Sequence, residues 1–145
     1  MNAIDILLLR HCEAQGQEPS APLTSRGKAQ AEELGRMLPN LPISRIFSSP
    51  YVRARDSVLS FAENSGLSVN LDERLIERDL GAQNRDDWRS VLEHSFENID
   101  FRCTNGETSR EAIVRARDLI DTVASPQLTL FATHGNLYTL ILESS

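Results

Sequence analysis

The feature that most constrains this chain is an apolar run near its start that ends in two basic residues. Ile4 to Leu9 is apolar apart from Asp5, and Arg10 and His11 follow directly. A run of this kind predicts a strand buried on both faces. In open α/β sheets, ligands bind just beyond the carboxyl ends of the strands. The first strand is therefore expected to deliver Arg10 and His11 to a functional site.

A second apolar run ends in the same way. Leu128 to Thr133 is followed by His134 and Gly135. A glycine turn between a strand and a helix places backbone N–H groups near a helix start, which is a natural site for an anion. Helical patterns separate the predicted strands, and this alternation predicts an α/β fold: a three-layer sandwich with a mostly parallel sheet and helices on both faces. Both histidines should then lie at the same edge of the sheet.

Start and stop signals predict the elements between these two runs. In the first half they are a helix from Thr24 to Pro39, a strand over Ile43–Phe47 and a second helix. Ser49 is the expected N-cap of this second helix, Pro50 is its first residue, and Asn64-Ser65-Gly66 ends it. In the second half they are a strand over 67–71, a helix from about Arg85 to Ser95 started by Asn84, a long helix after the capping-box spacing of Thr108 and Glu111, and a short helix around 137–141.

Length, charge and cysteine content limit the possible functions. With 145 residues, we expect a single domain over residues 1–145. The 15 basic and 21 acidic residues give a net charge of -6, which argues against nucleic acid or an anionic membrane as the partner. Two cysteines make no disulfide framework, and no leader precedes the first strand, so a cytoplasmic protein is the default expectation.

His11 is the candidate nucleophile. A neutral imidazole can attack when a hydrogen bond to its other nitrogen fixes the tautomer. The alternative is a core histidine at a strand end, but the adjacent Arg10 and the matching His134 favour the functional interpretation. Arg53 falls in the first turn of the predicted second helix, where its charge opposes the helix dipole, a cost that a bound anion would offset.

A leaving oxygen needs a proton, so a carboxyl group near the site would complete the machinery. Four acidic residues are candidates, and the residues alone do not choose among them: Asp72, Glu73, Glu77 and Asp79.

The remaining histidine and the two cysteines carry weaker hypotheses. His94 lies in a polar helical stretch and is expected to be exposed, and Cys103 is expected to be inert. Cys12 touches the site by sequence, so a redox or nucleophilic role is a minor alternative. No group of His, Cys and carboxylate residues has metal-ligand spacing, so no metal is expected.

Five segments together form a recognisable pattern. They are Leu9-Arg10-His11-Cys12-Glu13 and the stretches Leu23 to Ala31, Phe47 to Ala54, Leu75 to Gly81 and Phe131 to Gly135. In this order they resemble the motifs of the histidine phosphatase superfamily, which includes the phosphoglycerate mutases. The resemblance spans nearly the whole chain, and it implies a phosphoglycerate mutase-like fold.

The resemblance also implies roles for particular residues. His11 would attack phosphorus and become a phosphohistidine, while Arg10, Arg53 and His134 would hold the phosphoryl oxygens. Glu77 would protonate the leaving oxygen and then activate water. The family needs no metal for this chemistry, and no cofactor is expected.

The sequence departs from the family pattern at three positions. Cys12 stands where the family has glycine, Gln17 stands where it often has a phosphate-binding asparagine, and Leu80 stands where mutases often have tyrosine. The middle segment also lacks the arginine pair with which mutases grip a sugar-acid carboxylate. These departures favour hydrolysis over mutase transfer. The expected phosphate-binding set is Arg10, His11, Gln17, Arg53, His134 and Gly135.

The sequence therefore predicts a metal-independent phosphatase of the histidine acid phosphatase type, acting on a small phosphorylated substrate. The alternatives are a phosphoglycerate mutase and, in a different class, a non-catalytic module that binds phosphate or a phosphoprotein.

The end of the chain departs from the family as well. Only ten residues follow Gly135, whereas typical members continue through a longer helix and a further strand. The chain is either a trimmed member or a shortened sequence. An exposed sheet edge favours self-association, so a homodimer is a further expectation.

Overall fold

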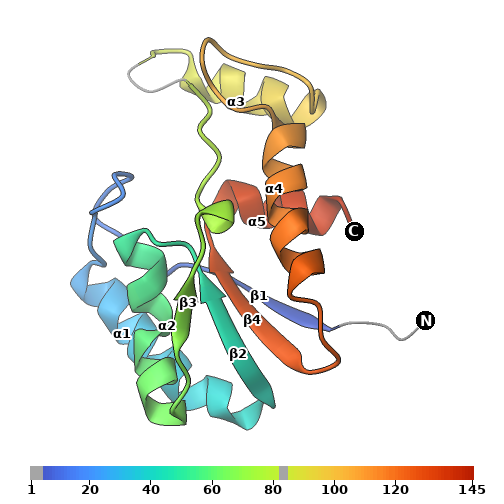
Figure 1. Ribbon diagram of the computed structural model, residues 1–145. Coiled ribbons are helices and arrows are strands. Elements are labelled where there is room, and N and C mark those ends of the chain that lie inside the picture. Colours follow the sequence, from blue (N-terminus) through green and yellow to red (C-terminus); the bar gives the residue numbers. More distant parts are fainter. Residues whose placement is uncertain (1–4, 82–84) are drawn as a thin grey trace.

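The fold is built on one parallel sheet. The computed structural model describes residues 5–81 and 85–145, and within them the sheet has four strands (Figure 1). The strands are β1 (Ile6–Arg10), β2 (Ile43–Ser48), β3 (Val69–Leu71) and β4 (Leu128–Thr133), in the spatial order β1-β4-β2-β3. The two strands that are followed by a histidine, β1 and β4, are neighbours and run parallel, so both histidines lie at the same edge of the sheet, as predicted.

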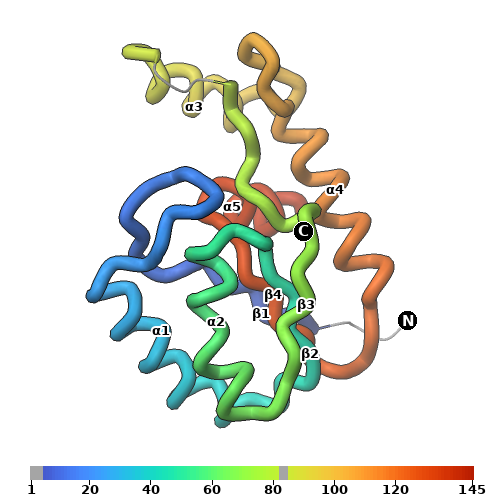
Figure 2. The backbone as a smooth tube through the Cα atoms, turned by 60° about the vertical axis from the view of Figure 1, so that its left-hand side comes forward, coloured from blue at the N-terminus to red at the C-terminus, as the bar shows by residue number. Residues whose placement is uncertain are grey.

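Helices cover both faces of this sheet, which confirms the predicted three-layer architecture. The described helices are α1 (Ser25–Met37), α2 (Val52–Ser65), α3 (Trp88–Glu97), α4 (Ser109–Thr122) and α5 (Gly135–Glu143), with short 3-10 turns η1 (Leu38–Asn40) and η2 (Glu73–Leu75). Figures 1 and 2 show α1 and α2 side by side on one face and α4 and α5 on the other, while α3 stands apart from the sheet. No helix in the described ranges is long and apolar enough to cross a membrane.

Alternation along the strands divides the core into two clusters. In the central strand β4, Leu130 and Ala132 pack with α2, whereas Phe131 packs with α4 and α5. These β4 residues are fully buried, but the residues of β1 are only half-buried. The apolar run of β1 thus belongs to an edge strand, and the prediction of burial on both faces was wrong for it. The expected homodimer stays a prediction.

Strand register brings three chain segments to the same edge. Arg10 lies opposite Thr133, and Ser48 lies opposite Ala132. The ladder continues for one residue past the strands, because the N–H of His11 donates to the Thr133 carbonyl at 2.9 Å, and the N–H of Ser49 donates to the Ala132 carbonyl at 3.0 Å. The residues that follow β1, β2 and β4 are consequently placed beside one another.

Three helix ends that local capping residues determine lie where the sequence predicts them. Thr24 caps α1 by accepting the N–H of Gly27, and Gly66 ends α2 with a left-handed φ of 68°. Thr108 and Glu111 form the predicted capping box of α4.

Two helix starts were predicted wrongly. The second helix begins at Val52 rather than at Pro50, and α3 begins at Trp88, later than the predicted Arg85; Asn84 lies outside the described residues.

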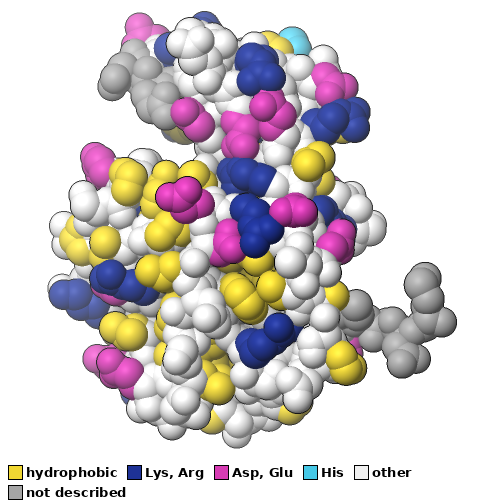
Figure 3. Space-filling model, in the orientation of Figure 1, with side chains coloured by type: hydrophobic (Ala, Val, Ile, Leu, Met, Phe, Trp, Pro, Cys, Tyr) yellow, Lys and Arg dark blue, Asp and Glu magenta, His cyan; other side chains and the backbone are white. Residues whose placement is uncertain are grey.

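We call the excursion that carries α3, residues 79–81 and 85–107, the cap. It rises from η2, turns through α3 and returns to the first turn of α4 (Figure 1). Figure 3 shows the molecule hollowed between the cap and the sheet with its helices, and a cleft of about 1270 Å³ lies there.

Candidate active site

The carboxyl edge of the sheet brings together the two predicted histidines and two predicted arginines. The ring centroids of His11 and His134 are 5.1 Å apart. Arg53, from the first turn of α2, donates from Nε to Nε2 of His11 at 3.3 Å. Arg10 precedes His11 and lies against Gly135. These five residues come from three segments of the chain that are distant in sequence.

Hydrogen bonds fix the tautomer of His11. Its Nδ1 lies 2.7 Å from the carbonyl oxygen of Cys12, which can only accept, so Nδ1 carries the hydrogen. A guanidinium can only donate, so the Nε2 that faces Arg53 carries a lone pair. Burial, together with the charges of Arg53 and Arg10, lowers the pKa of His11. His11 is thus held neutral, with the lone pair of Nε2 directed at Arg53.

His134 has the opposite arrangement. It is 1% exposed, and its Nε2 lies 2.8 Å from Oγ of Ser49. Ser49 Oγ already accepts the N–H of Tyr51 at 3.2 Å, so its own proton is available for His134 Nε2. The hydrogen of His134 is then on Nδ1, which is buried and has no partner among the described residues. Burial lowers the pKa of His134 to about 3, so the ring offers a neutral, unused N–H.

Arg53 and Arg10 differ in exposure and in how many of their hydrogen-bond donors are already used. Arg53 is 1% exposed and is held by the Glu18 carbonyl, to which Nη1 donates at 2.9 Å. Arg10 is exposed, and within residues 5–81 and 85–145 its guanidinium makes no hydrogen bond or ion pair. It lies over Gly135, where a Cβ atom would come within 3.0 Å of the guanidinium carbon. Gly135 thus makes room for a cation with unused donors.

Glu77 lies where η2 leads into the cap, at the start of α5. Its Oε2 accepts the N–H of Asn136 at 3.0 Å, and its Oε1 accepts the N–H groups of Leu137 at 3.0 Å and Arg78 at 2.9 Å. Its charge acts on both His11 and Arg53. Glu77 is therefore fixed beside the histidines and also lines the cleft.

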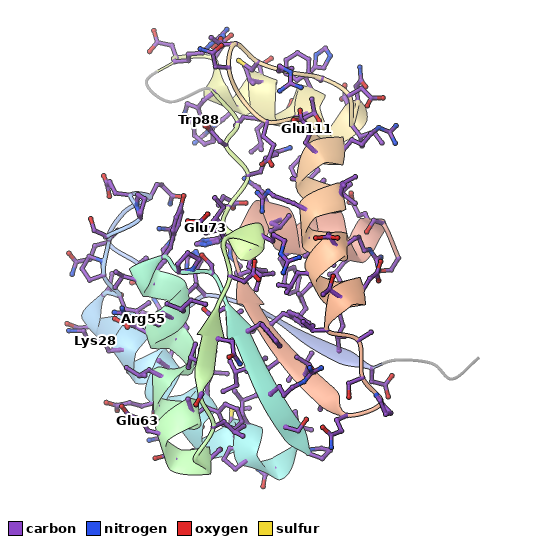
Figure 4. The ribbon with its side chains drawn as sticks, in the orientation of Figure 1. Lys28, Arg55, Glu63, Glu73, Trp88 and Glu111 are labelled. Carbon is purple, nitrogen blue, oxygen red and sulfur yellow. The ribbon has the colours of Figure 1, made fainter. Side chains whose placement is uncertain are left out.

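The other three acidic candidates are placed differently. Asp72 caps η2 and pairs with Arg74 at 2.9 Å. Glu73 is exposed on η2 (Figure 4). Asp79 lines the cleft at the base of the cap, where its Oδ1 accepts the N–H of Gly81. Of the four, Glu77 is the one that accepts hydrogen bonds from Asn136 and Leu137 at the start of α5 in the described part of the chain.

The residues that depart from the family pattern are also placed. Gln17 is exposed and lines the cleft. Cys12 is buried, its N–H donates to Ser57 Oγ at 2.8 Å, and its side chain packs with Leu23 and Ala31. Burial raises the pKa of the Cys12 thiol, which opposes thiolate chemistry. The extra side chain is accommodated in the core rather than in the site.

His94 and Cys103 lie in the cap. His94 is exposed, as expected, and stacks on Phe101 at 4.3 Å between ring centroids. Cys103 is buried against Arg85. Among the described residues, no group of three or more His, Cys, Asp or Glu side chains is arranged to hold a metal ion.

Sequence reasoning missed two residues of this region. Ser49 was interpreted as a helix cap, although the ladder places it beside His134. Arg78 was not singled out, and it is 3% exposed on the wall of the cleft. The signal for Ser49 was its position one residue beyond a strand. Nothing local distinguishes Arg78 from a surface arginine.

Fold and site together define a three-layer α/β protein with a pair of neutral histidines, two arginines and a carboxylate at the carboxyl edge of its sheet. The chain belongs to the histidine phosphatase superfamily (branch 1), whose family model matches residues 6–144. Members of this superfamily are phosphatases or mutases.

Two curated relatives illustrate this range. The chain is 31% identical to a protein of Erwinia tasmaniensis named "probable phosphoglycerate mutase GpmB", over 91% of the chain and 70% of that relative. It is 32% identical to the fructose-2,6-bisphosphatase TIGAR of Xenopus tropicalis, over 74% of the chain and only 42% of that protein.

Solved structures show the same fold. A mycobacterial glucosyl-3-phosphoglycerate phosphatase with inorganic phosphate superposes with a TM-score of 0.84 at 24% identity, covering 98% of the chain and 78% of that structure. The alpha-ribazole phosphatase of Shigella flexneri gives a TM-score of 0.75 at 22% identity, covering 96% and 78%.

Proposed function

We propose that this protein is a phosphatase that hydrolyses a small phosphomonoester, without a metal, through a phosphohistidine on His11. The observation that carries the proposal is the state of His11. Its Nδ1 hydrogen is engaged by the Cys12 carbonyl, and its Nε2 lone pair is directed at Arg53. This is the arrangement that a nucleophilic imidazole needs beside a phosphate that arginines hold.

In the first step, His11 Nε2 forms a bond to phosphorus as the bond between phosphorus and the leaving oxygen breaks. Arg10, Arg53 and the unused Nδ1–H of His134 bind the phosphoryl oxygens and stabilise the charge that develops on them. A proton that enters with the phosphate group of the substrate passes through Glu77 to the leaving oxygen, so that the leaving group departs as an alcohol.

In the second step, Glu77 takes a proton from water, and the water oxygen attacks the phosphohistidine. The bond between phosphorus and Nε2 breaks, inorganic phosphate leaves, and His11 is again neutral. Gln17 and the N–H of Gly135 are the further groups proposed to contact the phosphoryl oxygens, since Gln17 lines the cleft and Gly135 begins α5.

The test is hydrolysis of a generic aryl phosphate in the presence of a chelator, with a quenched reaction probed for a phosphoryl label. Wild-type protein should hydrolyse the aryl phosphate and carry an acid-labile, base-stable phosphoryl label. His11→Ala should lose both, with turnover falling by at least about a thousandfold. His94→Ala is the matched control, because it removes an exposed histidine of the cap. A panel of phosphomonoesters that yields neither label nor hydrolysis overturns the proposal and leaves a phosphate-binding module.

A mutase is the second candidate, favoured by the relative from Erwinia tasmaniensis. A mutase returns the phosphoryl group to an acceptor rather than to water. Interconversion of 2- and 3-phosphoglycerate faster than release of inorganic phosphate would identify it.

A further inference from the structure

The cleft extends well beyond the residues that would hold a phosphate group. Its volume is about 1270 Å³, and Arg53 and Glu77 lie in its wall at the end near His11. The wall at the other end comes from the cap (Figure 3). In a phosphatase, this outer space receives the part of the leaving group that lies beyond the leaving oxygen.

Two ion pairs occupy the wall where the cap meets α4. Arg102 pairs with Glu111, and Arg115 forms a two-bond pair with Glu107 at 2.7 and 2.9 Å. All four side chains line the cleft. Because these charges are matched within the protein, this part of the wall does not select a ligand by an unpaired charge.

Apolar side chains of the cap border the same space. Leu80, Trp88 and Leu92 line the cleft, and Trp88 begins α3. Trp88 is the only tryptophan of the chain, and it is 46% exposed. Figure 4 shows it on the side of the cap that borders the hollow. One exposed apolar side chain needs no explanation by itself, but this one lies in the wall of the cleft that also contains Glu77.

The indole ring of Trp88 is covered from outside the cleft. The guanidinium carbon of Arg89 lies over the ring, 5.2 Å from its centroid. Arg89 is absent from the described residues that line the cleft, whereas Trp88 is among them. The ring surface that borders the cleft is therefore left open to a ligand. Aromatic rings pack on such a surface in stacked or edge-to-face arrangements.

The other aromatic ring of the cleft is already engaged. Tyr51 contacts the ring of His134, with 5.1 Å between the centroids, and the guanidinium carbon of Arg53 lies 5.2 Å from the Tyr51 centroid. Tyr51 thus belongs to the histidine end of the cleft. Trp88 is the aromatic surface that the candidate site does not use.

We infer that Trp88 binds an aromatic ring carried by the leaving group of the substrate. The inference rests on the proposed function and narrows its substrate class to phosphomonoesters of alcohols that carry such a ring. The ring would lie against the cap while the phosphate lies at the histidine end, with the leaving oxygen beside Glu77. Trp88 is then a specificity-determining residue, since it contacts the leaving group and not the reacting atoms.

A purely structural role for Trp88 makes a different prediction. Trp88 is the first residue of α3, and Arg89 packs on it. If supporting the cap were its whole role, loss of Trp88 would slow the hydrolysis of every substrate by the same factor, whether or not the leaving group carries a ring.

The experiment compares alkyl phosphates that differ only in a terminal ring. Ethyl, 2-phenylethyl and 2-cyclohexylethyl phosphate form a short series, and butyl, 4-phenylbutyl and 4-cyclohexylbutyl phosphate form a longer one. All six release primary alcohols, so their intrinsic reactivities are similar. In at least one series, wild-type protein should prefer the phenyl compound to the ring-free compound by about 10- to 100-fold in kcat/KM. It should prefer the phenyl to the cyclohexyl compound by about 2- to 10-fold, because a saturated ring buries similar apolar surface but does not stack.

Substitutions of Trp88 should change these ratios in different ways. Trp88→Leu keeps an apolar side chain but removes the aromatic face, so the ratio of phenyl to cyclohexyl should fall to about unity. Trp88→Ala should reduce the ratio of phenyl to ring-free compound by at least about fivefold, and Trp88→Phe should retain most of both preferences. Each ratio is measured within one variant, so it is independent of the folded fraction.

Leu59→Ala is the matched control. Leu59 is an apolar side chain of α2 that is 39% exposed and does not line the cleft, so both ratios should stay within about twofold of wild type. The inference is overturned if wild type does not prefer phenyl to cyclohexyl in either series, or if Trp88→Leu leaves that ratio unchanged.

Binding without turnover separates this inference from the proposed function. In His11→Ala, calorimetry should show that the phenyl compound of the preferred series binds at least about tenfold more tightly than its ring-free counterpart. Adding Trp88→Ala should remove most of this difference. This result without hydrolysis by wild type would refute the phosphatase and keep the Trp88 site. Hydrolysis by wild type with equal affinities for the two compounds would do the reverse.

Discussion

The two histidines of the site use opposite ring nitrogens for their hydrogen bonds. His11 donates from Nδ1 to a carbonyl and leaves Nε2 as a base, while His134 accepts at Nε2 from Ser49 and leaves Nδ1 as a donor. Both rings are neutral, because burial lowers the pKa of each. One neutral pair thus presents a lone pair and an N–H at the same edge of the sheet. The partners that select the two tautomers, a backbone carbonyl and a serine, do not titrate.

His134 should make stability depend on pH. Its pKa is about 3 in the folded chain, against 6.5 for an ordinary imidazole. Between these values the unfolded chain binds a proton that the folded chain does not, so the free energy of unfolding should fall as pH drops from about 6.5. The loss is at most about 1.4 kcal/mol per pH unit. Urea unfolding at pH 7 and pH 5 should show a larger decrease for wild type than for His134→Gln. Equal decreases would contradict the neutral, buried state of His134.

For single residues, the sequence predicts which residues belong to the site better than it predicts which residues they contact. Arg10, His11 and His134 were identified because they follow apolar runs, which is a local signal. The choice of Glu77 came from the resemblance and not from its neighbours. Ser49 and Arg78 were missed because their roles depend on contacts with residues distant in sequence, His134 and Ser109.

At the scale of elements, α5 links the parts of the site. Its first residue, Gly135, lies under Arg10, and the N–H groups of Asn136 and Leu137 hold Glu77. The start of one short helix therefore positions both a cation and the carboxylate. A helix N-terminus suits this arrangement, because its first N–H groups have no partners within the helix.

Gly135→Ala should test this arrangement. The new methyl group would lie 3.0 Å from Arg10 Cζ and Nε, so the guanidinium must shift by a few tenths of an ångström. Affinity for inorganic phosphate, measured by calorimetry, should fall several-fold, while the free energy of unfolding changes by less than about 1 kcal/mol.

Gly66→Ala should give the opposite result. Gly66 has open space around it but a φ of 68°, so alanine is strained there by about 1–2 kcal/mol. Phosphate affinity should be unchanged. If Gly135→Ala bound phosphate as wild type does, Arg10 would not be part of the phosphate site.

Helix ends were predicted correctly where residues close in sequence determine them. The caps at Thr24 and Thr108 and the stop at Gly66 need only their own neighbours. The start of α2 was wrong because Ser49, a good local cap, is held by the β4 ladder and by His134. A tertiary contact overrode the local preference.

At the scale of the whole molecule, α4 ties the cap to the sheet and its helices. Arg115 of α4 bonds Glu107 at the foot of the cap and donates from Nη1 to the Arg74 carbonyl of η2 at 2.8 Å. The side chains of the ion pair are only 19% and 22% exposed, so solvent screens it weakly. The alternation of strands and helices predicted the layers, but it could not predict how the cap is attached, because no periodic pattern describes the cap.

Arg115→Gln should loosen this attachment. The free energy of unfolding should fall by about 1–3 kcal/mol, because Glu107 loses a partly buried partner. Hydrogen exchange of residues 98–108 should become faster than in wild type. Arg36→Gln, which breaks an exposed pair with Glu33, should cost less than about 1 kcal/mol and leave the cap unchanged. Equal small effects of the two substitutions would show that Arg115 does not hold the cap.

The two ends of the cap lie side by side between η2 and α4, where the Asp79 carbonyl accepts the N–H of Glu107 at 2.6 Å. The residues around the two histidines come from other stretches of the chain. Substitutions confined to the cap can therefore change the outer wall of the cleft without changing the residues around the two histidines. Gene duplicates that diverge in the cap would therefore differ in the outer wall of the cleft and share the same residues around the two histidines.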